Sequence, residues 1–134
     1  MDNKVEVQIQ SLQTIQEFFY SGDMKFIYFL TILMGVDVLT GISKGFKNGN
    51  LWSKKSYKGI GKKTLIFCII VLGNIIDLIL NLNGALVTCT VLYYIGHEGL
   101  SIVENCAEMD VLVPEQIKEK LKVMNDDTKH DKEV

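Results

Sequence analysis

The residues of this chain that could do chemistry are few, and three of them are acids within apolar sequence: Asp37, Asp77 and Glu98. His97 precedes Glu98, but the pair lacks the spacing of a zinc-protease motif, and the other histidine, His130, lies in a charged tail. The sequence contains no Ser/His/Asp set, glycine-rich phosphate loop or metal-ligand cluster. It therefore predicts no catalytic site, no metal site and no cofactor.

Three apolar stretches contain these acids, at residues 26–43, 64–82 and 85–103. A helix needs about 20 mostly apolar residues to cross a bilayer, so each stretch is close to a span in length. Asn83-Gly84, between the second stretch and the third, is typical of a tight turn. The sequence therefore predicts an all-α integral membrane protein. Its three transmembrane helices are expected within residues 24–109, the second and third forming a hairpin.

The segments on either side of these spans are predicted to be amphipathic helices. Residues 1–22 place apolar side chains on one helical face, which would lie on the membrane surface or pack on a partner. Residues 110–124 include a second such pattern after Pro114, which suits the first turn of a helix. Residues 125–134 are charged and almost without apolar side chains, so we expect them to be disordered.

A lysine-rich segment, residues 44–63, joins the first two spans and contains no acid. Short loops rich in lysine tend to stay on the cytoplasmic side of a membrane, so the N-terminus is expected outside and the C-terminus inside. The segment is too short for a nucleic-acid domain, and anionic lipid headgroups are the expected counter-charge. The lysines assigned to headgroup binding are Lys44, Lys47, Lys54, Lys55, Lys58, Lys62 and Lys63.

Polar stripes run along the three predicted spans and should not face lipid, because a charge at the bilayer centre costs about 2.5–3.5 kcal/mol. One interpretation is pairing within a single bundle, for example of Asp37 with Lys44 or of Glu98 with Lys62. The other is self-association, in which the stripes join copies and later line an aqueous opening. Three short helices have little interior for three acids, so we expect a homo-oligomer. The candidate assembly and lumen residues are Asp37, Gly41, Asn74, Asp77, His97, Glu98 and Ser101.

Several segments resemble a known family in their order and spacing. They are Asp37-x-x-Thr40-Gly41, then Leu51-Trp52-Ser53 and Lys58-Gly59-Ile60-Gly61-Lys62-Lys63, then YIGHEGLSIVEN from Tyr94, and finally the helix after Pro114. Over residues 24–124 the chain resembles the small lysis holins of phages that infect Gram-positive bacteria, including the toxin-secretion holins of clostridia. The resemblance implies a protein that accumulates in the bacterial cytoplasmic membrane and then assembles into lesions. An endolysin or a toxin would leave the cell through them.

Other functions fit the same sequence. An antiholin, which blocks lesion formation, would have the same spans, and the resemblance also allows an antiholin as a partner. A membrane anchor or accessory subunit would contact another protein through residues 1–22 or through the tail. A soluble helical bundle fits the long apolar stretches less well. A small ion-coupled transporter would explain the buried acids, but no inverted repeat is visible.

Overall fold

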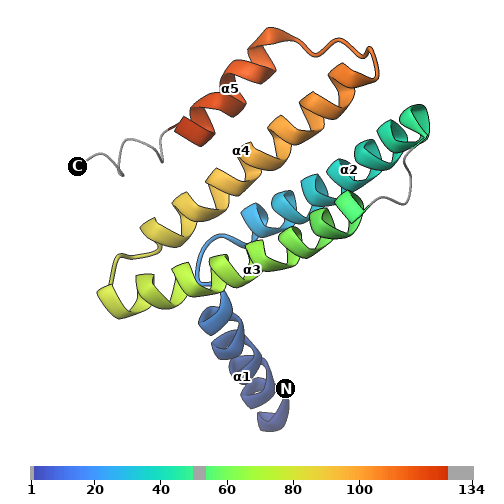
Figure 1. The fold of residues 1–134 in the computed structure, drawn as a ribbon. Helices are drawn as coiled ribbons and strands as arrows, with labels where there is room; N and C mark the ends of the chain where they lie inside the picture. The colour runs from blue at the N-terminus through green and yellow to red at the C-terminus, as the bar shows by residue number, and fades with distance from the viewer. Residues whose placement is uncertain (1, 50–53, 127–134) are drawn as a thin grey trace.

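The structure is a computed structural model that describes residues 2–49 and 54–126, and these residues form five helices and no strand (Figure 1). The helices are α1 (Asn3–Phe19), α2 (Met24–Asn48), α3 (Lys54–Leu80), α4 (Ala85–Glu108) and α5 (Glu115–Asp126). Within the described residues, three helices are long and apolar enough to cross a membrane: α2, α3 from Lys58 onward, and α4. The predicted all-α class with three helices of membrane-spanning length is confirmed.

The helix α4 is central to the bundle and packs against α2, α3 and α5. Helices α2 and α4 run in the same direction and α3 runs opposite to both, while α5 lies along α4 on the far side from α2 and α3 (Figure 1). A small apolar core fills the space between α2, α3 and α4. Its buried members are Tyr20, Leu30, Met34, Ile66, Ile70, Val87, Val91 and Ile95.

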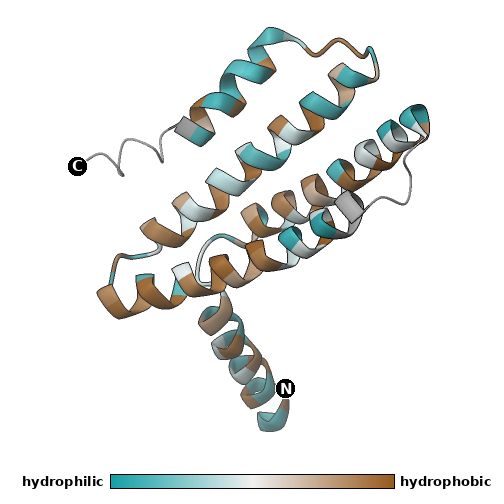
Figure 2. Cartoon of the chain, viewed as in Figure 1, coloured by the Kyte–Doolittle hydropathy of each residue, from teal (hydrophilic) through white to brown (hydrophobic). Residues whose placement is uncertain are grey.

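Many large apolar side chains of α2 and α3 point out of the bundle, and both helices are largely apolar in Figure 2. Phe29, Ile32 and Leu39 of α2 are exposed, as are Leu72 and Ile79 of α3. In water, a surface of this kind would favour association with a membrane or another protein. In lipid, by contrast, an apolar outer surface needs no cover, because lipid tails are as apolar as the side chains.

The connection between α2 and α3 is shorter than the basic loop expected at residues 44–63. Helix α2 continues to Asn48 and ends at Gly49, whose φ of 72° is the left-handed conformation common after a helix. Helix α3 begins at Lys54, and the part of the expected loop at residues 50–53 lies outside the described residues. Lysine is a good helix former, and its long stem can carry the charge to polar surroundings. A lysine-rich segment can therefore form helix ends instead of a loop.

The turn between α3 and α4 lies at residues 81–84, where the sequence predicts it. Asn81, Asn83 and Gly84 all have positive φ, at 54°, 55° and 83°. Glycine adopts this conformation without a steric cost, and asparagine tolerates it better than most residues. The two helices are therefore joined by a short reversal that keeps them side by side.

The two terminal helices differ in how they meet the bundle. Helix α1 projects away from it, and none of its residues is buried, so the apolar side chains of its amphipathic face stay exposed (Figure 1). Helix α5 folds back along α4 and begins at Glu115, directly after Pro114, within the expected segment 110–124. The first two residues of the expected disordered tail, 125 and 126, belong to α5, and the rest of it, from residue 127 onward, lies outside the described residues.

Candidate functional site

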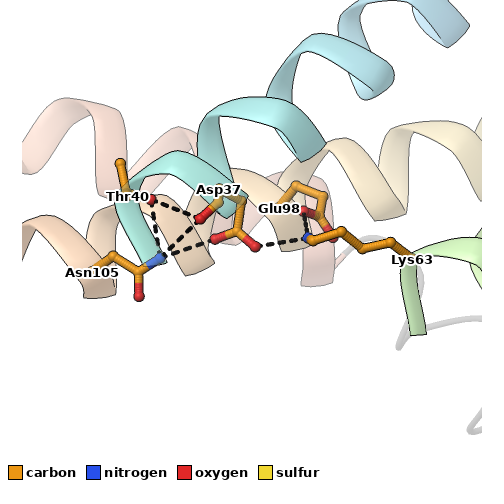
Figure 3. Close-up of polar contacts among 5 residues, drawn as sticks. All are labelled: Asp37, Thr40, Lys63, Glu98 and Asn105. Carbon is orange, nitrogen blue, oxygen red and sulfur yellow. Dashed lines mark hydrogen bonds and ion pairs between the residues drawn. The ribbon is translucent and has the colours of Figure 1, made fainter. Parts of the chain in front are cut away.

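The side chain of Lys63 joins all three apolar helices (Figure 3). Its Nζ, on α3, lies 2.7 Å from Oδ2 of Asp37 on α2, and it also donates a hydrogen bond to Oε2 of Glu98 on α4. The three side chains are mostly withdrawn from the surface, with 17% of Lys63, 13% of Asp37 and 3% of Glu98 exposed. One cation therefore serves two carboxylates near the middle of the bundle.

Asn105 extends this network along α4 (Figure 3). Its Nδ2 donates to Oδ1 of Asp37 at 3.1 Å and to Oγ1 of Thr40 at 3.0 Å. The Thr40 hydroxyl in turn donates to the carbonyl of Asp37 at 3.0 Å. Gly41 lies beside the network, where an added Cβ would be 3.8 Å from Nδ2 of Asn105, so a small side chain would fit there. We call Asp37, Thr40, Lys63, Glu98 and Asn105 the three-helix network.

The three-helix network is suited to holding helices in register. It contains no nucleophile with an adjacent base, and the described residues include no group of three or more His, Cys, Asp or Glu that could hold a metal ion. A buried ion pair adds little net stability compared with apolar packing, but losing one partner leaves a buried charge uncompensated. The network therefore disfavours helix arrangements that separate Lys63 from Asp37 and Glu98.

The structure pairs these acids within one chain, but with partners that differ from those expected. Asp37 does not contact Lys44, which lies 2.9 Å from Glu108 instead. Glu98 pairs with Lys63 and not with Lys62, the exposed residue that precedes Lys63 in the chain. Successive helical residues point about 100° apart, so only the packing of α3 on α4 decides which lysine faces inward. Both expected pairs were wrong for this reason.

The lysines assigned to lipid headgroups have different surroundings. The ammonium of Lys63 points inward to the three-helix network, where it contacts Asp37 and Glu98. Lys47 lies 2.9 Å from Asp110, just beyond α4, and both side chains are exposed. Lys58 and Lys62 are also exposed, so headgroup binding stays a prediction for them. Lys54 and Lys55 begin α3.

Asp77 belongs to a separate site at the α3–α4 turn. It is 2% exposed, and its carboxylate accepts hydrogen bonds from the backbone N–H of Gly84 at 2.8 Å and of Val87 at 3.1 Å. The first turn of a helix has unpaired N–H groups and a partial positive charge. Asp77 therefore caps α4 from the preceding helix, which explains how this acid is accommodated inside the bundle.

Asn74 is fully buried and fastens the end of α1 to α3. Its Oδ1 accepts from the backbone N–H of Ser21 at 2.9 Å and from the Ser21 hydroxyl at 2.8 Å. Its Nδ2 donates to the carbonyls of Glu17 at 3.1 Å and Phe18 at 2.8 Å, which the end of α1 leaves unpaired. Beside this contact, burial raises the pKa of Tyr20, and the Asp23 charge raises it further.

The remaining candidates lie apart from the network. His97 is exposed, and its ring stacks on Tyr93 with the centroids 6.4 Å apart. Ser101 is partly buried on α4. Of the seven predicted assembly residues, the structure thus brings together Asp37, Gly41 and Glu98. It adds Lys63, Thr40 and Asn105, and of these Asn105 has a sequence signal, because it follows Glu98 by seven residues on one helical face.

Comparison with known proteins gives a consistent result over nearly the whole chain. Residues 14–126 match the profile of the bacteriophage holin family. The chain is 36% identical to a probable holin of Bacillus phage phi105, over 90% of this chain and 89% of that protein. It is also 36% identical to the protein YqxH of Bacillus subtilis, over 94% of this chain and 89% of YqxH. A 14.9 kDa protein of the nagH 3' region of Clostridium perfringens is 36% identical as well, over 92% of this chain and 94% of that protein. No solved structure matches the chain.

Proposed function

Because this chain belongs to the bacteriophage holin family, we propose that it assembles in the cytoplasmic membrane of a host bacterium and opens lesions through which an endolysin crosses. A toxin is the alternative cargo. The observation that carries the proposal is the combination of an apolar surface on α2 and α3 with a charged network enclosed between three helices. This arrangement suits a small protein that is surrounded by lipid and still contains ionisable groups.

The three-helix network gives each copy a defined shape before it assembles. Lys63 pairs with both Asp37 and Glu98 between the helices, so a single copy can enter lipid without presenting these charges to hydrocarbon. Copies that share one helix register present the same surface to one another, as symmetric assembly requires. We therefore assign Asp37 and Glu98 to assembly through the register that they impose. Asp77 contributes to assembly by holding the α3–α4 turn, and Asn74 contributes by holding α1 in position.

The charge distribution supports an orientation with the N-terminus outside and the C-terminus inside. The end of α2, the beginning of α3 and the reversal after α4 lie at one end of the bundle (Figure 1). Lysines concentrate at this end, which is expected to face the cytoplasm and its anionic lipids. Helix α1 would then lie at the outer surface, with its exposed apolar face in the headgroup region.

Inducible expression in a bacterium tests the proposal. Membrane potential and the release of proteins of graded size are followed after induction of the wild-type chain. We expect the potential to collapse abruptly after a delay and a protein of endolysin size to escape. Asp37→Asn, Asp77→Asn and Glu98→Gln should each change the delay, because each weakens a bond that positions a helix. A cell that keeps its potential contradicts the proposal, and unchanged timing in all three variants contradicts the assignment of the acids.

One observation favours a second function, that of an antiholin. The charges of the three-helix network are satisfied within a single chain, which suits a protein that stays closed and inhibits others. Expression of the chain alone separates the two functions, because a holin kills the cell and an antiholin does not. An antiholin would also delay lysis when it is expressed together with a holin.

A further inference from the structure

Helix α5 is seated in a notch on α4 that two glycines create. A Cβ added to Gly99 would lie 2.5 Å from Cδ2 of Leu121. A Cβ added to Gly96 would lie 2.9 Å from Cβ of Met124 and 3.2 Å from the carbonyl oxygen of Leu121. At Gly96 the close atoms are a Cβ and a backbone oxygen of α5, so a larger residue there would push α5 away from α4. At Gly99 a larger residue would instead displace the side chain of Leu121. The contact is therefore a fitted one and not a loose approach of two surface helices.

The notch lies halfway along α4. Gly96 is the twelfth residue of this helix, which runs from Ala85 to Glu108. The middle of a membrane-spanning helix lies near the middle of the bilayer, and α5 lies alongside this part of α4 (Figure 1). With α4 placed across the bilayer, the segment of α5 around Leu121 would lie at the depth of the hydrocarbon core.

The outward face of α5 is mostly charged at this depth, although the apolar Val123 is also exposed there. Glu115, Glu119, Lys120 and Lys122 are exposed, and the last three lie within two residues of Leu121. Figure 2 shows the contrast between this polar helix and the apolar α2 and α3. Charged side chains in the middle of a membrane face a protein interior or water, because facing lipid is too costly. The bundle is thus two-sided, with one side suited to lipid and the other to water.

We propose that the charged face of α5 lines the aqueous lumen of the lesion, with α4 behind it and α2 and α3 facing lipid. A single bundle cannot border water in the middle of a bilayer, but several copies with α5 turned inward enclose it. The inference rests on the proposed function and deepens it, because it names the surface that contacts the cargo. It also gives the three-helix network a place outside the lumen, between the spans.

Paired substitutions on α5 test whether its contact with α4 is needed. Leu121→Asp places a charge against Gly99, whereas the control Val123→Asp places the same charge on the opposite, exposed face of α5. Each purified protein is added to vesicles of phosphatidylethanolamine and phosphatidylglycerol that contain labelled dextran. We expect Leu121→Asp to release at least ten-fold less dextran than wild type, and Val123→Asp to match wild type. Equal or faster release by Leu121→Asp overturns the inference.

A disulfide between the two helices tests whether α5 remains docked in the open lesion. The three native cysteines are first replaced by alanine, and Gly99→Cys is combined with Leu121→Cys. Leu121 Cγ, which marks roughly where a cysteine sulfur would lie, is 3.4 Å from the Cβ position of residue 99, so the bond can form. We expect the oxidised protein to release as much dextran as its reduced form. Release only after reduction means that α5 must leave α4, which overturns the inference while the proposed function stands. If wild-type protein releases nothing, the proposed function fails and the inference fails with it.

Discussion

Replacing Lys63 by methionine tests the central argument about the three-helix network. The substitution keeps a long apolar stem and removes the ammonium that lies 2.7 Å from Asp37 and also bonds to Glu98. Two carboxylates are then left without their cation, and Glu98 is only 3% exposed. Asp37 keeps the hydrogen bond from Asn105, at 3.1 Å, so the loss should be smaller than that of two independent pairs.

The expected cost follows from the burial of the pair. Removing one partner of a buried ion pair typically costs about 3–5 kcal/mol, and we expect Lys63→Met to fall near the lower end of this range. A loss of about 3 kcal/mol lowers the ratio of folded to unfolded protein by on the order of 100-fold. Helix content measured by circular dichroism in detergent micelles, against rising dodecyl sulfate, reports this change.

Two further variants make the result interpretable. Lys62→Met makes the same chemical change at the exposed neighbouring position and should alter stability by no more than about 0.5 kcal/mol. Combining Lys63→Met with Asp37→Asn and Glu98→Gln removes all three charges and should recover most of the lost stability. If Lys63→Met and Lys62→Met are equally stable, Lys63 is not the shared counter-ion and the reasoning is refuted.

Three other substitutions test separate parts of the bundle. Asp77→Ala removes the cap of α4 and should cost about 1–2 kcal/mol in the same titration, with faster hydrogen exchange at the Val87 amide; unchanged exchange would count against the cap. Asn74→Ala removes the hydrogen bonds that hold the end of α1, so a protease should cleave near residue 21 several-fold faster than in the wild-type chain. Cleavage at the wild-type rate would mean that other contacts hold α1. Gly84→Ala should lower stability by about 1 kcal/mol, because residue 84 has a φ of 83°. Gly35→Ala is its control and should be neutral or stabilising, because an added Cβ there meets nothing within 4 Å. Equal effects of the two substitutions would contradict the turn geometry.

Some of the network could be anticipated from the sequence. The acids stand out because a charge inside an apolar stretch needs a partner, and Glu98 and Asn105 lie on one helical face. Their cation could not be chosen in the same way. Lys62 and Lys63 are adjacent in the chain, and nothing in the local pattern indicates which of them faces α4. Nothing in the local sequence indicates that Asn74 binds carbonyl groups of α1, more than fifty residues earlier in the chain.

The sequence by itself determined the number, type and approximate length of the spans and the turn between the second and third. These depend on sums over about 20 neighbouring residues, or on the backbone preferences of asparagine and glycine, and both are local properties. Only the tertiary structure decided that Lys63 is shared by two acids, that Asp77 caps α4, and that α5 is seated at Gly96 and Gly99. Each of these contacts depends on how whole helices rotate and approach one another. That geometry is set by the packing of all the helices together, and no single segment of the chain contains it.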